Sequence, residues 1–579
     1  MTAPRYFAAI AQDRPLPQHY ASQPDPALNR VDLGETVSLW TTDHLIKIGD
    51  RGAIIGHLFT RSVPSRRISM LDRETARRIV ETGIDSLTTN FWGNYVVFLR
   101  DADNNITIIR DPLGGLPAYW REDKGVILIA PEVGAYPFRA IDGVTVEFSA
   151  LAVHLWDVHA AGQRTCLKGV NELLPGHALR VGQCITSVRS IWMPWQYARK
   201  AKTAPFPDPS ALTATILDVI SAWSGCFDTV ALGISGGLDS SIVSAGLARA
   251  DGAIRLYNMA WSDPEGDERN AAQLVADEYG ADLEIFHYDR RDVNICAPNV
   301  PGTARPFLAP YIQSIAKAHD KILETSSVDA MMDGDGGDAV FCLMQSVTPI
   351  IDRIASRASL SAIWTTAKDL ASVTNSDIFR ISRYLAARMF KYPSRQSYPG
   401  DDTFLSREQI DHGLSAVDSH PWRARQVDLL PGSQAHIWMI RRALGNDGFH
   451  SRRTHPPLIS PLLSQPVVEM CLAFPSWEWI AGGIDRSVIR RALTDVLPAA
   501  IVKRRSKGGP SGFLNHLYWL NESKILAHLR SGVLAEAGVL DREKLDQIGR
   551  NRNAIAPGTP RRLLSLVSAE SWARHWMPA

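Results

Sequence analysis

The chain has 579 residues, more than one hydrophobic core usually organises, so we expect at least two domains. Its 62 Lys and Arg residues balance 61 Asp and Glu residues, which gives no reason to expect a nucleic-acid or membrane partner. The sequence shows no signal peptide or membrane-spanning apolar run, and its six cysteines have no CxxC or disulfide-scaffold spacing, so we expect a cytoplasmic protein.

Residues 1–200 have the pattern of a β-rich domain. The runs "GNYVVFL", "NITIIRD" and "GVILIA" are short and rich in branched and aromatic residues, which is typical of strands. Turn sequences such as "DPLGG" and "LLPGH" separate the runs, and we predict a sandwich of sheets. The proline-rich stretch Arg199–Ser210 predicts a linker to a second domain over residues 210–579.

The second domain begins with alternating helix and strand patterns. Leu212, Ile216, Val219, Ile220 and Trp223 recur at helical spacing. Strands are predicted at "TVALGI", "IRLYNMA", "DLEIFHY" and "VDAMM", and helices at "SSIVSAGLARA", "DERNAAQLVADEYG" and residues 311–323. This alternation predicts a doubly wound parallel sheet. Beyond about residue 341 the chain is predicted to be mostly helical.

The turn "SGGLDSS" follows one of these predicted strands and precedes a helix, where such sheets bind ligands. Its glycines let the backbone approach an anion, and Ser235, Ser240 and Ser241 offer hydroxyl groups. The N–H groups at the start of the helix complete a cradle for phosphate. Asp239 would repel phosphate unless a cation lies between them, and Mg2+ binds carboxylates and phosphates together. An ordinary capped turn would explain a lone glycine pair, but not the whole string.

A second acidic glycine turn, "MMDGDGGDAVF", follows the predicted strand "VDAMM". Asp333, Asp335 and Asp338 are spaced by glycines in this turn. An EF-hand is excluded because its downstream Glu is missing, which leaves a Ca2+-like surface turn or a flexible acidic loop as the alternatives. Because both turns end neighbouring strands, we predict one shared metal–nucleotide site, with Asp239 and Asp338 as the metal ligands.

Five motifs in order resemble the asparagine synthetase family of ATP pyrophosphatases: "SGGLDSS", "NMAWSDPEGDERNAAQLVADEYG", "DGDGGDAVF", "PLLSQPVVEMCLAFP" and "VKRRSKGG". Two earlier segments, "FWGNYVVFLRDADNNITIIRDPLGGLPAYW" and "NELLPGHALRV", resemble the glutaminase domain of that family. The resemblance implies an Ntn-type α+β sandwich, like a class II glutamine amidotransferase, over residues 1–200. It implies a doubly wound synthetase domain with many helices over residues 210–579, which uses ATP and Mg2+ and releases AMP and pyrophosphate.

The resemblance also implies roles for single residues. Catalysis would involve Lys507, Asp335 and Arg505, with Lys507 stabilising the transition states and Arg504 and Arg505 helping to hold pyrophosphate. A solvated basic loop is the alternative interpretation of that segment. Asp335 stands where asparagine synthetases carry Glu, and Ser464 where they carry Asp. The ATP-binding residues would be Leu232, Ser235, Gly236, Gly237, Leu238, Asp239, Ser240, Ser241, Met259 and Gly334.

The N-terminal domain departs from the family pattern. A glutaminase of this family needs cysteine as its second residue, but Thr2 stands there, and the first cysteine of the chain is Cys166. We therefore predict that the domain does not release ammonia from glutamine. The attacking amine would then belong to the substrate, as it does in the β-lactam synthetases and in the cyclases that close lasso peptides.

Two stretches, "SPLLSQPVVEMCLAFPSWEWIAGGIDRSVIRRAL" and "RRSKGG", resemble lasso cyclases. This resemblance implies a core peptide as substrate, a macrolactam between its Asp or Glu side chain and its N-terminal amine, and a leader-peptide protease as partner. A β-lactam synthetase and an ammonia-using asparagine synthetase remain alternatives, as does a nucleotide-binding scaffold with a relic site. Trp477 and Trp479 are predicted to pack between helices.

Overall fold

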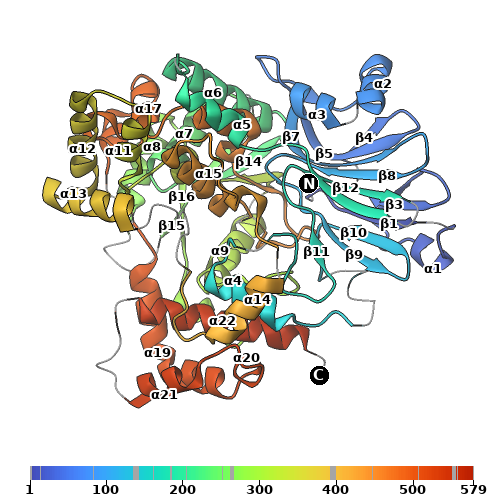
Figure 1. The fold of residues 1–579 in the computed structure, drawn as a ribbon. Coiled ribbons are helices and arrows are strands. Elements are labelled where there is room, and N and C mark those ends of the chain that lie inside the picture. The colour runs from blue at the N-terminus through green and yellow to red at the C-terminus, as the bar shows by residue number, and fades with distance from the viewer. Residues whose placement is uncertain are drawn as a thin grey trace.

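The computed structural model describes residues 3–12, 15–42, 44–82, 84–134, 138, 143–160, 162–182, 185–203, 205–250, 252–260, 267–325, 327–391, 400–416, 418–445, 448–505, 508–550, 556 and 558–577. Two antiparallel sheets form the N-terminal part, and a parallel sheet surrounded by helices lies beside them (Figure 1). The fold is α/β, as the sequence predicts.

The antiparallel sheets contain the three strands predicted from the apolar runs. Among the described residues, the strand orders are β11-β9-β10-β1-β3-β2 and β13-β12-β8-β7-β5-β4, with β6 paired to β5. The first sheet consists of β1 (Tyr6–Ala11), β2 (Asn29–Val31), β3 (Val37–Thr41), β9 (Tyr119–Asp123), β10 (Val126–Ala130) and β11 (Asn171–Glu172). The second consists of β4 (Leu45–Ile48), β5 (Gly52–Thr60), β6 (Arg67–Ile68), β7 (Phe91–Arg100), β8 (Ile106–Arg110), β12 (His177–Gly182) and β13 (Ile185–Ser190).

Alternating side chains of these strands fill two separate cores. Tyr6 of β1 and Phe98 of β7 meet edge to face between the sheets, with ring centroids 5.7 Å apart. Val97 points the other way, into a core closed by Ile79 of α2 (Arg73–Thr82) and Leu87 of α3 (Ile84–Asn90). Successive strand residues point to opposite faces, so each sheet face needs its own cover. The predicted sandwich of sheets is confirmed, with helices on its outer face.

The parallel sheet has the order β16-β15-β14-β17-β18 in the described residues. Leu232 and Met332 face a core shared with α6, α7 and α8, whereas Ala231 and Met331 face Ile322 of α9 on the other side. Helices on both faces confirm the doubly wound sheet. The two-residue strand β18 was not predicted because so short a run has no periodicity. The elements are β14 (Thr229–Gly233), β15 (Ala253–Ala260), β16 (Leu283–His287), β17 (Ala330–Met332), β18 (Leu458–Ile459), α6 (Pro209–Ser224), α7 (Leu238–Leu247), α8 (Arg269–Glu278) and α9 (Ile312–Thr325).

Most of the chain after residue 341 is helical, as predicted. Two of its last helices, α19 and α22, pack against each other and share a core with α4 (Phe148–Trp156) from the N-terminal part (Figure 1). The helices from α10 onward are α10 (Gly337–Val340), α11 (Thr348–Ala355), α12 (Leu360–Thr374), α13 (Ile378–Ala386), α14 (Arg407–Ala416), α15 (Pro431–Ala443), α16 (Gln465–Leu472), α17 (Ser487–Ala492), α18 (Ala499–Lys503), α19 (Ser511–Arg530), α20 (Val533–Glu536), α21 (Arg542–Arg550) and α22 (Thr559–Trp576).

The predicted linker lies against the body of the protein. Residues Arg199–Lys202 form a 3-10 turn with Ala201 fully buried, and Asp208 caps α6 by accepting a hydrogen bond from the Ser210 N–H at 3.0 Å. Trp477 and Trp479 are both buried, which confirms that they pack in the core. Among the described helices, none combines the length and apolar character needed to cross a membrane.

A few residues of the sandwich, among them Phe59 and Trp92, extend the core of the parallel-sheet part. Phe59 and Trp92 stack at 4.4 Å between ring centroids, and Trp223 of α6 meets Phe59 edge to face at 4.9 Å. Glu469 of α16 accepts hydrogen bonds from Arg61 at 2.7 Å and from the Trp192 indole at 2.9 Å. Apolar stacking and a half-buried ion pair therefore fix one part against the other, so that they can form a common cavity.

Candidate active site

The phosphate-loop candidate connects β14 to α7. Gly236 has φ +65°, and a Cβ there would lie 2.3 Å from the Ala271 backbone carbon, so only glycine fits. The Ser235 hydroxyl accepts a hydrogen bond from the Gly237 N–H, and the Ser240 hydroxyl accepts one from the Ser235 N–H, each at 3.2 Å. The loop is thus closed on itself, and Ser235 and Ser240 line a cavity.

The acidic glycine turn after β17 lies directly against this loop. A Cβ on Gly334 would approach the Ser240 nitrogen to 2.5 Å, and one on Gly337 would approach the Asp239 carboxyl carbon to 2.5 Å. Since β14 and β17 are neighbours in the sheet, their carboxyl ends meet at the same edge. The structure therefore brings the two predicted turns together.

Asp239 and Asp338, the predicted metal ligands, converge on the guanidinium of Arg486. One nitrogen, Nη1, lies 3.1 Å from Asp239 Oδ1 and 2.6 Å from Asp338 Oδ1. Burial alone would lower the pKa of Arg486, but Asp239, Asp338 and Asp485 raise it overall. A fixed cation therefore already lies between the two carboxylates.

These residues fit a Mg2+–nucleotide complex. Mg2+ is usually held by one or two carboxylates together with phosphate and water oxygens, and two carboxylates meet here beside the phosphate loop. Because the same oxygens contact Arg486, a metal held by both aspartates would take over part of that contact. In the described part of the chain, no group of three or more His, Cys, Asp or Glu forms a complete protein-only metal site.

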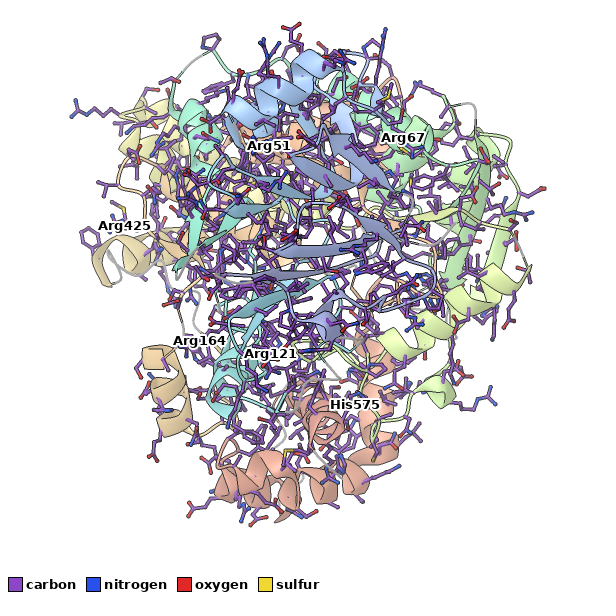
Figure 2. The ribbon with its side chains drawn as sticks, turned by 90° about the vertical axis from the view of Figure 1, so that its right-hand side faces the viewer. Arg51, Arg67, Arg121, Arg164, Arg425 and His575 are labelled. Carbon is purple, nitrogen blue, oxygen red and sulfur yellow. The ribbon has the colours of Figure 1, made fainter. Side chains whose placement is uncertain are left out.

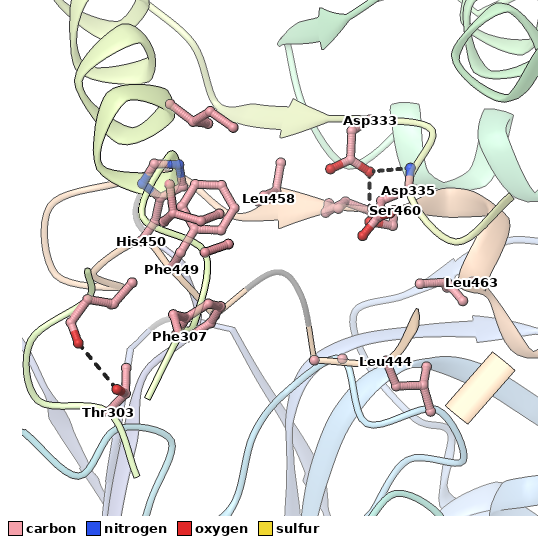
Figure 3. A pocket seen from close by; sticks show the side chains of 18 of the residues that line it. Thr303, Phe307, Asp333, Asp335, Leu444, Phe449, His450, Leu458, Ser460 and Leu463 are labelled. Atoms are coloured by element: carbon pink, nitrogen blue, oxygen red, sulfur yellow. Dashed lines mark hydrogen bonds between the residues drawn. The ribbon is translucent and has the colours of Figure 1, made fainter. Parts of the chain in front are cut away.

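Asp333 and Asp335 form a second acidic feature of the same turn. Asp333 Oδ1 accepts hydrogen bonds from the Asp335 N–H at 3.0 Å and from the Ser460 hydroxyl at 2.7 Å (Figure 3). Burial, and then the charge of Asp335, raises the pKa of Asp333 to about 7. Asp333 can therefore exchange a proton near neutral pH, and both carboxyl groups line the cavity.

The cavity at these strand ends has a volume of about 1590 Å³. Its walls come from the parallel-sheet part and from the sandwich, which contributes residues such as Asn94, Arg110 and Glu172. Apolar side chains, among them Phe307 and Phe449, surround the space next to the Asp333 and Asp335 turn (Figure 3). The site therefore joins a polar strand-end region to a large, partly apolar chamber.

The basic segment after α18 is attached to the phosphate loop. Arg504 donates hydrogen bonds to the Ser235 carbonyl oxygen at 3.1 Å and to Glu268 at 3.0 Å, and the Gly508 N–H donates to Glu268 at 3.1 Å. Arg505 lines the cavity and donates to the Gly483 carbonyl oxygen at 3.3 Å. Lys507 lies outside the described residues, but its described neighbours on both sides are fixed beside the loop.

Other predicted ATP-binding residues differ in their exposure to the cavity. Gly237, Leu238, Met259 and Gly334 line it. Three do not: Leu232 is fully buried in the core, Gly236 packs against α8, and the Ser241 hydroxyl donates to the Gly237 carbonyl oxygen at 2.7 Å.

Ser464 also lines the cavity. Its hydroxyl accepts a hydrogen bond from the buried Trp223 indole at 3.0 Å. Ser464 therefore supplies a hydrogen-bond acceptor to an N–H group of the core.

The first described residues lie at the same cavity. Thr2 is outside the described residues, whereas Ala3 and Pro4 line the cavity and the Ala3 N–H donates to the His455 carbonyl oxygen at 3.4 Å. Cys166, the first cysteine, is buried, and burial raises its pKa to about 12. It therefore lacks the accessible thiolate that a nucleophile needs.

Sequence reasoning missed Arg486 and Glu268 as site residues. Glu268 lies within a quoted motif but carries no glycine or metal-ligand signal. Arg486 is 247 residues from Asp239, and only the glycine pair at 482 and 483 before it indicated a turn. Its left-handed backbone, with φ +51°, directs the chain into α17.

The chain was compared with known proteins. No protein of curated function matches it significantly. Two solved structures are similar at TM-scores too low to support any conclusion. The allosteric regulatory enzyme of purine biosynthesis has 12% identity over 57% of this chain and 84% of that chain, with a TM-score of 0.21. Glutamine phosphoribosylpyrophosphate amidotransferase from B. subtilis, complexed with ADP and GMP, has 13% identity over 57% and 85%, with a TM-score of 0.20. The asparagine synthase family matches residues 227–574, and the chain belongs to that family.

Proposed function

We propose that this protein is an ATP-dependent macrolactam synthetase that closes the ring of a lasso peptide. Membership in the asparagine synthase family supports the general part of this proposal, an ATP-dependent synthetase that forms amides. The substrate would be a core peptide with an Asp or Glu side chain to activate and an N-terminal amine to attack it.

The observation that carries the proposal is the size and lining of the cavity. Small-molecule pockets usually measure about 300–1,000 Å³. At about 1590 Å³, with walls from both parts and apolar side chains next to the acidic turn, this cavity has room for a peptide beside a nucleotide. The absence of cysteine from residues 1–165 supports an amine that comes from the substrate and not from glutamine.

In the first step, an oxygen of the peptide carboxylate attacks the α-phosphorus of ATP, and pyrophosphate leaves. The Ser235 and Ser240 hydroxyls and the start of α7 would bind the phosphates, since N–H groups at a helix start favour anions. Mg2+ held by Asp239 and Asp338 would neutralise phosphate charge. Arg486 supplies fixed positive charge at the same point.

In the second step, the peptide amine attacks the acyl carbon, the amide bond forms, and AMP leaves. The amine must lose a proton as it attacks. Asp335, whose backbone N–H is held by Asp333, would accept this proton within the cavity. Lys507 and Arg505 would oppose the negative charge that develops on the acyl oxygen and phosphate.

The test uses a candidate core peptide, sought among short open reading frames near the gene for this protein, together with a leader-peptide protease. Mass spectrometry should show the loss of one water only with ATP present. An ATP analogue with a methylene bridge between the β- and γ-phosphates should still support ring closure, and one bridged between α and β should not. Cyclisation with the α,β-bridged analogue, or none with ATP, would refute the proposal.

The alternative functions predict different products when other substrates are tested in the same assay. Ammonia-dependent conversion of aspartate to asparagine would favour an asparagine synthetase. Ring closure within a small amino acid derivative would favour a β-lactam synthetase. Failure of every substrate to generate AMP would favour a nucleotide-binding scaffold.

A further inference from the structure

One wall of the cavity carries an excess of arginine. Arg110 of β8 and Arg305 share the single carboxylate of Glu172, which accepts a hydrogen bond from Arg110 at 2.8 Å and another from Arg305. Burial would raise the pKa of Glu172, but Arg305 and Arg110 lower it to about 2. Both oxygens of Glu172 are therefore ionised and engaged. We call this wall, with Arg441, the arginine chamber.

Arg441, on α15, is the third arginine of the chamber. In the described part of the chain it has no hydrogen-bond acceptor and no ion-pair partner, and its Nε is inaccessible to solvent. Burial lowers its pKa to about 10; Glu172 opposes this effect, whereas Arg305 and Arg110 add to it. Arg441 remains charged at neutral pH without a bonded counter-ion.

In the described part of the chain no other group forms an ion pair with Arg441, although the charge of Asp157 also raises its pKa. Asp157 pairs with Arg423 at 3.4 Å. His154 and His159 line the same wall, and burial together with neighbouring arginines lowers the pKa of each to about 3, so both are neutral. The chamber thus carries three guanidinium groups and one carboxylate.

Arg441 is partly buried, and a charge withdrawn from water without a partner is costly, so proteins usually pair such a charge or replace it with an apolar residue. All three arginines line the cavity, so an anion in the cavity can reach the chamber. A guanidinium binds a carboxylate with two parallel hydrogen bonds, which makes arginine a specific receptor for this group. The phosphates of ATP have their own loop at the strand ends. The anion expected here is therefore a second carboxylate of the substrate.

We propose that Arg441, flanked by Arg110 and Arg305, binds the C-terminal carboxylate of the peptide substrate. The activated side-chain carboxylate must lie at the strand ends, and every linear peptide has a C-terminal carboxylate as well. The sandwich would contribute to substrate binding through Arg110 and Glu172. This assignment of the substrate's second contact rests on the proposed function.

The test compares the core peptide of the cyclisation assay as the free acid and as the C-terminal carboxamide. The wild-type protein should bind the acid about 10- to 100-fold more tightly, the range for a hydrogen bond to a charged group. Arg441→Met should abolish this preference, and Arg441→Lys should restore it in part. Arg425→Met is the matched control, because Arg425 is exposed at the edge of the molecule and does not line the cavity (Figure 2).

A second probe does not depend on the peptide. Sodium acetate, compared with chloride at equal ionic strength, should raise the melting temperature of the wild type by on the order of 1 °C and leave Arg441→Met unchanged. Arg441→Met itself should melt no lower than wild type, since it removes an uncompensated charge.

Equal binding of acid and amide would overturn the assignment of the C-terminal carboxylate. Weaker ATP binding by Arg441→Met would instead assign Arg441 to the nucleotide site. If acetate raises the melting temperature of the wild type but the protein closes no ring, the anion site at Arg441 would be supported and the proposed function rejected.

Discussion

At the strand ends, Asp239, Asp338 and Asp485 contact Arg486, and Asp485 also pairs with Arg490. In the arginine chamber, by contrast, Arg110 and Arg305 share the carboxylate of Glu172, with Arg441 beside them. Both regions open into one cavity. The acidic end can accept a metal-bound nucleotide, because its carboxylates can exchange one cation for another. The basic end can accept a carboxylate, because Arg441 has no bonded counter-ion in the described part of the chain. The difference shows how one cavity can hold the two ends of a charged substrate in a fixed direction.

The largest expected effect comes from the acidic end. Asp239→Asn and Asp338→Asn should each lower product formation by at least about 10²–10³-fold, because each removes a metal ligand and leaves Arg486 undercompensated. Pyrophosphate release and cyclised peptide are measured at several Mg2+ concentrations. Asp329→Asn, before the start of β17, is the control and should keep full activity. Wild-type turnover by Asp239→Asn at ordinary Mg2+ would contradict the account.

Lys507→Met tests the basic segment attached to the acidic end. Ring formation should fall by about 10²–10³-fold while ATP affinity stays within a few-fold, because the charge acts mainly in the transition state. Lys507→Arg should restore little of the rate of ring formation, because the planar guanidinium group does not replace the compact ammonium group. Single-turnover cyclisation and calorimetric ATP binding separate the two effects. A Lys507→Met enzyme that cyclises at the wild-type rate would identify the segment as a solvated loop.

Asp333→Asn should change the pH dependence of stability by about 2 kcal/mol between about pH 5 and about pH 8. The folded-state pKa of Asp333 is raised from 3.8 to about 7, so the folded protein keeps a proton that the unfolded chain loses, and stability falls as pH rises through this window. In Asp333→Asn, this loss of stability with rising pH should be absent. Urea unfolding of both proteins at the two pH values measures it.

Asp352→Asn is the matched control for Asp333→Asn. Burial also raises the pKa of Asp352 to about 7, but it accepts its hydrogen bonds from Ser476 and Gly432 and does not line the cavity. Both substitutions should flatten the dependence of stability on pH. Only Asp333→Asn should also shift the pH–rate profile of cyclisation. An unchanged rate profile in Asp333→Asn would remove Asp333 from the proton path.

The smallest expected effect concerns glutaminase activity, which should be absent. Glutamine added to the purified protein should yield no ammonia above background, with or without ATP, because Cys166 is buried and far from the start of the chain. Glutamate production is followed by coupled assay. Steady release would show that another group, such as Thr2, acts as nucleophile.

Local patterns predicted the parts of the molecule that local forces determine. The apolar runs identified β7, β8 and β10, and the helical spacing from Leu212 to Trp223 identified the buried face of α6. The serine–glycine string located the loop after β14, because closely approaching backbone leaves a distinct glycine signature. Asp239 and Asp338 could be paired from sequence because adjacent parallel strands end at the same edge.

Long-range contacts could not be predicted in this way. Arg486 reaches Asp239 across 247 residues, and Glu172 meets Arg305 across 133. No spacing rule connects such positions, and an arginine near a glycine pair is indistinguishable from many solvated ones. The raised pKa of Asp333 likewise depends on burial that only the packed structure provides.

The most direct test of the central claim follows the oxygen of the activated carboxylate. A core peptide whose acidic side chain carries ¹⁸O in both carboxyl oxygens is cyclised with ATP. Adenylation predicts that each ring closed transfers one ¹⁸O to the phosphate of AMP, because the carboxylate oxygen that attacks the α-phosphorus leaves with AMP. Label in inorganic phosphate with ADP as the other product, or unlabelled AMP from a reaction that closes rings, would contradict the account.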